Sequence, residues 1–220
     1  MRKLKIPDNL TARAYHSIKE HILDGQLDED SRLTEGSLSS RLGISKSPIR
    51  EALNRLEAEG LVRIEPRKGA YLRRLSASEM NELYELREAL EVHVVRIAKV
   101  TPAVLLELSR SIRRQRAFMK ANDKAHSIEE DVHFHAELAR STDNGHLCTV
   151  LQNTQNQIWL CRRKTYDLSG STAPAYHQSI VNALENNDRA KAQEAMREHI
   201  KRVRRRLLQF MEEHHGRASR

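Results

Sequence analysis

The stretch GISKSPIREALNRLEAEGLVRIEPRKGAYL, residues 43–72, decides the fold of the first third of the chain. It contains, in order, a turn, a helix, a second turn and two short strands. Gly43 supplies the positive φ that a tight turn between helices requires, and Ser45 stands where a helix N-cap is expected. Gly60 ends the helix. This order of elements predicts the second half of a winged helix-turn-helix.

The segments on either side of that helix complete the predicted motif. Residues 10–23 and 34–42 have the apolar spacing of two further helices. Residues 61–64 and 70–73 read as two strands joined by a hairpin. The strands are joined by Glu65-Pro66-Arg67-Lys68-Gly69, with Arg67 and Lys68 at the tip. A basic tip with a glycine, which allows close backbone approach, is expected to meet phosphates or the minor groove of DNA.

The predicted recognition helix has an apolar face and a polar face. Ile49, Leu53 and Leu56 point to the core. The opposite face carries four polar residues, Lys46, Ser47, Arg50 and Asn54. Residues at the start of a recognition helix enter the major groove, so these four are candidates for contacts with base edges or phosphates. The alternative for Arg50 is a pairing within the protein, with Asn54, Glu51 or Glu57.

The composition favours a nucleic-acid partner and a helical protein. The 220 residues carry a formal net charge of +8, and 4% of them are aromatic. Residues 1–75 hold 15 basic and 11 acidic residues, so half of the excess positive charge lies in a third of the chain, as suits a polyanion. No signal peptide and no apolar run of roughly 18 residues is recognised, so we expect no membrane segment. Cys148 and Cys161 could form a single bridge, but two buried thiols in a reducing cytoplasm are the favoured interpretation.

After residue 75 the sequence predicts helices without strands. Ser76 and Glu79 have capping-box spacing. They are followed by an apolar face of Met80, Leu83, Leu86, Leu90 and Val94. Thr101-Pro102 starts a second helix, and four more are expected at about 125–141, 146–166, 175–185 and 189–214. The fold is therefore predicted to be mainly α, with a winged helix-turn-helix in residues 1–75 and an antiparallel six-helix bundle in residues 76–220.

The N-terminal stretch resembles the GntR family of bacterial transcription regulators. The resemblance is carried by SKSPIREALNRLEAEGLVRIEPRKGAYL and covers roughly residues 8–75. It implies that double-stranded operator DNA is contacted from the start of the second helix, the start of the recognition helix and the wing tip. The implied residues are Arg32 or its neighbours, Ser45, Lys46, Ser47, Arg50, Arg67 and Gly69. The chain departs from the family at Thr34-Glu-Gly-Ser, where a basic residue is common.

Three of the eleven histidines stand out together with Asp131. Asp131 and His135 are four residues apart and share a helical face. His177 opens the fifth bundle helix, and His199 is aligned with apolar positions of the last one. Buried polar groups need partners. The residues alone leave two arrangements open. One is an Asp–His hydrogen bond with two unrelated histidines, and the other is a shared Zn²⁺, Ni²⁺, Mn²⁺ or Fe²⁺ ion.

The second half resembles the FCD domain, the effector domain of the FadR subfamily. The resemblance is carried by LREALE at 86–91, DVHFHAELA at 131–139, His177 with SIVNALENND, and AMREHI at 195–200. The D-x-x-x-H pair with two later histidines resembles the metal-binding variant in its shorter, VanR-like six-helix form. This resemblance implies a divalent metal ion held by Asp131, His135, His177 and His199. It also implies that Arg87 lines an effector pocket.

A metal ion in such a site keeps a positive charge and attracts an anion. We therefore expect a small organic acid as effector, bound by the ion and by the guanidinium fork of Arg87. Arg162 or Arg163 is expected to contribute in the same way from the fourth bundle helix, unless these two are surface cations.

These features together predict a cytoplasmic, homodimeric, ligand-responsive transcription regulator. We expect it to repress through a near-palindromic operator. Two other classes stay open, a metal-sensing regulator and a metalloenzyme fused to a DNA-binding module. The sequence offers no general base beside Asp131 except His133, which lies on the other face of its helix. It therefore favours a protein without enzymatic activity.

Overall fold

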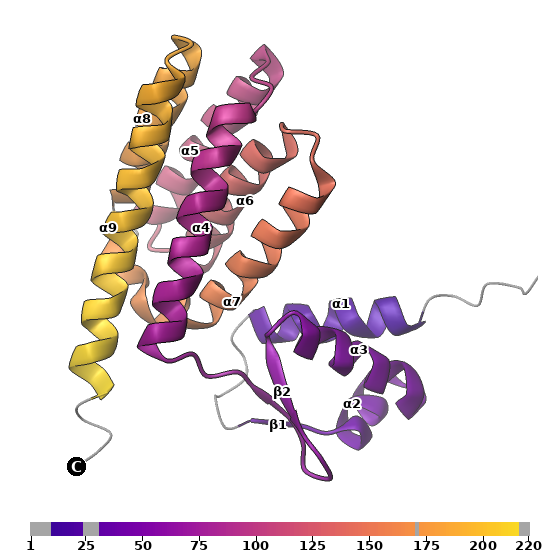
Figure 1. The fold of residues 1–220 in the computed structure, drawn as a ribbon. Coiled ribbons are helices and arrows are strands. Elements are labelled where there is room, and N and C mark those ends of the chain that lie inside the picture. Colours follow the sequence, from indigo (N-terminus) through magenta and orange to yellow (C-terminus); the bar gives the residue numbers. More distant parts are fainter. Residues whose placement is uncertain (1–9, 24–30, 170–171, 216–220) are drawn as a thin grey trace, which may run out of the picture. The chain divides into compact units, whose positions relative to one another are not determined.

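The computed structural model describes residues 10–23, 31–169 and 172–215, without the side chains of 162–165, 167–169 and 214–215. The chain divides into two compact units, Met1–Arg74 and Leu75–Arg220. In the described residues both units are mainly helical, and a small sheet belongs to the first of them (Figure 1).

The N-terminal unit is a winged helix-turn-helix (Figure 1). Its elements are α1 (Leu10–Leu23), β1 (Arg32–Leu33), α2 (Glu35–Leu42), α3 (Lys46–Ala58), β2 (Val62–Glu65) and β3 (Gly69–Leu72). Thr34 caps α2 by accepting a hydrogen bond from the amide of Ser37 at 3.1 Å. Gly43 ends α2 with a φ of 65°, which opens the turn to α3. The predicted three helices and hairpin are confirmed.

The sheet contains one strand that the sequence did not predict. β1 pairs antiparallel with β3, with Arg32 opposite Tyr71 and Leu33 opposite Ala70, so the strand order is β1-β3-β2. Leu33 and Ala70 are both buried. Two residues are too few to show the alternation that marks a strand in sequence, which is why β1 was missed.

The C-terminal unit is the predicted six-helix bundle (Figure 1). Its helices are α4 (Ala77–Ile97), α5 (Pro102–Lys120), α6 (Lys124–Arg140), α7 (Gly145–Ser169), α8 (Ala173–Glu185) and α9 (Arg189–His215). The capping box of Ser76 and Glu79 is present. Thr101 caps α5 by accepting from the amide of Val104. α4 packs against α9 and α7, while α5 packs against α6 and α8. No helix of the described ranges has the length and apolar character of a membrane span.

The buried face of α4 differs from the predicted one. Leu86, expected in the core, is 43% exposed, and Leu83 and Leu90 are half-buried. The buried residues are Met80, Tyr84, Arg87, Glu91, Val94 and Val95. Met80 and Val94 are buried as predicted, and Leu83 and Leu90 pack against the edge of the core. The centre of the buried face is shifted from Leu86 to Arg87 and Glu91, which pair with each other in the core. Apolar spacing alone contains no information on this pairing.

Candidate functional site

Helix α3 exposes the residues predicted to touch DNA. Ile49, Ala52, Leu53 and Leu56 are buried on one face. The opposite face is exposed and carries Lys46, Ser47, Arg50 and Asn54. Ser45 has the predicted N-cap position, but its side chain makes no capping hydrogen bond. The start of α3 is exposed, and water can satisfy its amides there.

Arg50 is paired with a residue of the preceding helix. Its Nε donates to Oε1 of Glu35 at 2.7 Å, and its Nη2 donates to Oε2 at 2.8 Å. The hydrogen bond from Arg50 is the main cause of the lowered pKa of Glu35. The Arg50 side chain is nevertheless 63% exposed. A pairing within the protein, the alternative expected for Arg50, is thus present, but its partner is Glu35. Of the expected partners, Glu51 accepts from Thr11 and Glu57 accepts from the amide of Ile64.

Replacing Arg50 by alanine is expected to weaken operator binding by about 1–3 kcal/mol and to relax base preference at one position. The reason is that Glu35 holds the guanidinium in a fixed orientation at the exposed end of α3. Fluorescence anisotropy with an operator duplex at constant salt measures the effect. The control is Arg110→Ala, which removes the same charge from α5. This variant should bind the operator with the affinity of the wild-type chain. An unaltered affinity for Arg50→Ala would remove Arg50 from the DNA contacts.

The wing tip has a backbone conformation that few residues adopt. Arg67 has a φ of 67° and Gly69 a φ of 116°. A Cβ atom added to Gly69 would lie 3.0 Å from the backbone oxygen of Leu33. A side chain at position 69 would therefore be strained and would also press on β1. Gly69 shapes the tip at a position that is also predicted to approach DNA.

Arg32 braces the wing from β1. Its Nε donates to the backbone oxygen of Lys68, and Nζ of Lys68 lies 3.1 Å from Oε2 of Glu65. Arg67 is exposed at the tip between them. Nε of Arg32 therefore makes a hydrogen bond within the protein. A contact between DNA and the other two nitrogens of its guanidinium group stays a prediction.

Asp131, His135, His177 and His199 come together in the core of the C-terminal unit. Asp131 and His135 lie one turn apart on α6, His177 lies near the start of α8, and His199 lies in the middle of α9. Each offers one ligand atom, and these four atoms all lie within 4.8 Å of one another. All four residues are buried. The four predicted ligands therefore gather at one place, so His177 and His199 are not unrelated histidines.

The donor atoms of this cluster fit a divalent metal ion. Nε2 of His135 and Nε2 of His177 are 3.3 Å apart. Both ring nitrogens of His199 are buried and have no hydrogen-bond partner in the described part of the chain. Burial, and then the nearby His177 and His135, hold the pKa of His199 well below its usual value. A neutral imidazole keeps the lone pair that a metal requires.

A buried ion pair lies in the same core. Nε of Arg87 donates to Oε1 of Glu91 at 2.6 Å, and both side chains are 1% exposed. Burial opposes the charge on each, but Arg87 and His135 lower the pKa of Glu91, while Glu91, Tyr84 and Asp131 raise the pKa of Arg87. Both groups are therefore charged. Nη1 and Nη2 of Arg87 have no hydrogen-bond partner among the described residues.

The sequence reading missed three polar residues of this core. Glu91 lies against Nδ1 of His135. Gln115 of α5 donates to Oδ1 of Asp131 at 3.4 Å, and Gln155 of α7 donates to Oε1 of Glu91 at 3.4 Å. The i,i+4 spacing of Arg87 and Glu91 was the one available signal. Arg162 and Arg163, the other predicted effector contacts, have side chains outside the described residues.

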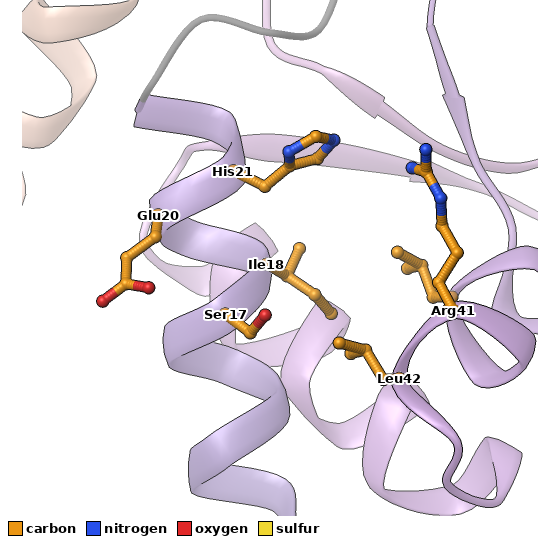
Figure 2. Close-up of a pocket in the computed structure, with 7 residues that line it drawn as sticks. Ser17, Ile18, Glu20, His21, Arg41 and Leu42 are labelled. Carbon is orange, nitrogen blue, oxygen red and sulfur yellow. The ribbon is translucent and has the colours of Figure 1, made fainter.

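A shallow hollow of about 300 Å³ lies between α1 and α2 (Figure 2). Figure 2 shows His21 of α1 and Arg41 of α2 on its two sides, with Ile18 and Leu42 below them in the view. Glu20 also lines it, so its rim carries both signs of charge. None of the residues predicted to touch DNA lines this hollow, and we assign it no ligand.

Two family models match the chain. "Bacterial regulatory proteins, gntR family" matches residues 10–72, and "FCD domain" matches residues 82–202. The uncharacterised regulator YdhC of Bacillus subtilis is 27% identical over 203 residues, which cover 90% of this chain and 89% of YdhC. The gluconate operon transcriptional repressor of the same organism is 28% identical over 143 residues, which cover 64% of this chain and 58% of that protein.

A solved structure has the same fold. Escherichia coli McbR/YncC aligns with a TM-score of 0.80 and 20% identity, covering 91% of this chain and 97% of that one. The matching families and the named relatives are transcription regulators and not enzymes. The FCD match alone spans more than half of the 220 residues, and the other match spans the winged helix-turn-helix. The chain therefore belongs to the GntR family of bacterial transcription regulators and carries an FCD domain.

Proposed function

We propose that this protein is a cytoplasmic repressor of the FadR subfamily that binds a divalent metal ion and a small organic acid in its FCD domain. Residues 1–75 bind the operator, and residues 76–220 bind the effector and dimerise. The observation that carries the proposal is the cluster of Asp131, His135, His177 and His199, whose ligand atoms lie within 4.8 Å of one another.

The donor set supports the metal ion. Three imidazoles and one carboxylate suit Zn²⁺, Ni²⁺, Mn²⁺ or Fe²⁺. Three neutral ligands and one negative ligand leave the site with a charge of about +1. A bound ion would supply an electrophilic anchor for an anion. It would also join α6, α8 and α9, because its ligands come from these three helices.

Buried donors near this cluster support an anionic effector. Nη1 and Nη2 of Arg87, whose Nε pairs with the carboxylate that lies against His135, lack hydrogen-bond partners among the described residues. A carboxylate can accept two parallel hydrogen bonds from a guanidinium edge. Arg162 is proposed as a further contact from α7. The relative that is named for the gluconate operon makes hydroxy acids such as gluconate the first candidates.

A homodimer would present two winged helices to two half-sites of an operator. The proposed contacts on each copy are Arg32, Ser45, Lys46, Ser47, Arg50, Arg67 and Gly69. Leu86 and Ile97 of α4 and Val150 of α7 are 43%, 37% and 46% exposed. We propose these exposed apolar side chains for the subunit interface. The effector would shift operator affinity only by the difference between its affinities for the two states.

Operator binding under defined metal and effector conditions tests this proposal. The operator is first selected from a random duplex library, and affinity is then measured by fluorescence anisotropy at constant salt. We expect tight binding by the metal-loaded protein. Adding gluconate or another acid of a carboxylate panel should weaken it about tenfold or more, which is about 1.4 kcal/mol.

The same measurement separates the alternatives. A metal-sensing regulator would change its operator affinity when the metal is removed by a chelator and recover it when the metal alone is added back. Its operator affinity would not respond to any acid of the panel. A metal-loaded protein whose operator affinity responds to no acid of the panel contradicts the proposed effector class.

A further inference from the structure

We propose that Glu91 is a positioning residue that holds the metal ligand His135 and the effector-binding cation Arg87 in one rigid group; this rests on the proposed function. Oε1 of Glu91 accepts from Nε of Arg87 at 2.6 Å and from Nε2 of Gln155 at 3.4 Å. Oε2 lies against Nδ1 of His135. A single buried carboxylate thus connects α4, α6 and α7.

The contact at Nδ1 determines how His135 faces the cluster. Neither Oε2 of Glu91 nor Nδ1 of His135 has another hydrogen-bond partner in the described ranges. A carboxylate accepts hydrogen bonds, so an Nδ1–H of His135 can donate to Glu91 while Nε2 faces the other ligand atoms. That Nε2 lies 3.3 Å from Nε2 of His177 and 3.8 Å from Oδ2 of Asp131. Glu91 therefore orients the His135 ring so that Nε2 is the atom presented to a metal.

The other oxygen of Glu91 orients Arg87. Nε of Arg87 already donates to Oε1 of Glu91. The edge formed by Nη1 and Nη2 is therefore the part of the guanidinium group that can still bind an anion. Arg87 and Glu91 are both fully buried, so neither can turn to water without its partner. Loss of Glu91 should therefore weaken metal binding directly and anion binding through Arg87. Of the two ligands, loss of Arg87 should weaken the binding of the anion and not that of the metal, as long as Glu91 still holds His135.

The substitution Glu91→Gln tests this role with the metal alone as probe. Competition with a chromophoric chelator gives the affinity for Co²⁺ and Zn²⁺, and the visible absorption of bound Co²⁺ reports the ligand field. We expect a loss of affinity of about 10- to 100-fold and shifted Co²⁺ bands, because His135 becomes less basic without its carboxylate.

Two control variants separate positioning from stability. Glu88→Gln removes the same charge from α4 at a residue that pairs with Arg197. Val94→Ala opens a cavity at a fully buried position of the same helix. Both should keep the metal affinity and Co²⁺ spectrum of the wild-type chain. If Glu91→Gln does not fold, Glu91→Asp is used instead. Aspartate keeps the negative charge, but its side chain is one methylene group shorter, so the carboxylate moves away from Arg87 and His135.

The outcomes distinguish this inference from the proposed function. A folded Glu91 variant with wild-type affinity and spectrum overturns the role of Glu91 and leaves the metal site intact. An equal loss of affinity in Val94→Ala also overturns it, because general destabilisation then explains the effect. A wild-type chain that binds neither Co²⁺ nor Zn²⁺ overturns the metal site and the role of Glu91 together.

Discussion

Alanine at both His177 and His199 is expected to reduce bound metal from one ion per chain to background. The two remaining ligands, Asp131 and His135, both lie on α6, and a two-ligand site loses most of the chelate's affinity. Elemental analysis after loading and dialysis measures the metal content. A ligand at 1,000 times its Kd stabilises the folded state by roughly 4 kcal/mol, so metal should raise the melting temperature of the wild-type chain and not that of the variant.

A histidine outside the cluster gives the matched control. His126 lies in the first turn of α6, its side chain is 57% exposed, and it pairs with Asp123. His126→Ala should therefore retain the full metal content and the metal-dependent melting temperature. Stoichiometric metal in the folded double variant would refute the assigned ligands.

Replacing Arg87 by methionine is expected to lower the free energy of unfolding of the C-terminal unit by about 3–5 kcal/mol. Methionine keeps much of the volume but leaves the carboxylate of Glu91 buried without its cation. The variant should also lose its response to organic acids, because Nη1 and Nη2 are removed with the guanidinium group. Urea unfolding followed by circular dichroism measures the first effect, and operator release by the acid measures the second.

The double variant Arg87→Met with Glu91→Leu separates these two effects. Replacing both members of a buried ion pair by apolar residues is often neutral for stability, so most of the lost stability should return. The acid response should stay absent because no cation is restored. An Arg87→Met chain as stable as the wild-type chain would show that the pair does not hold this part of the core together.

The sequence predicted those features that depend on neighbouring residues. The capping box at Ser76, the cap at Thr101 and the glycine turn at Gly43 act within a few residues, and all three are confirmed. Helical spacing likewise located the six bundle helices. It placed Leu86 in the core wrongly, because spacing describes a periodic face and not the partners that decide which face is buried.

The candidate site depends on contacts between distant residues. The i,i+4 spacing of Asp131 and His135 pointed to one half of the cluster. His177 and His199 join it from other helices; their helical positions made them candidates, and the family resemblance assigned them to the same ion. Glu91 belongs to the site because of His135, 44 residues later. Gln115 belongs to it because of Asp131. No local pattern could have revealed either contact.

The pairing of Arg50 with Glu35 has a consequence for changing which operator this protein reads. Base preference at the position that Arg50 reads would belong to both helices, since the carboxylate that aims the guanidinium comes from α2. A graft of α3 alone into a relative would carry the arginine without its aligning partner. The unit to exchange between regulators is therefore the α2–α3 pair, Glu35 to Ala58.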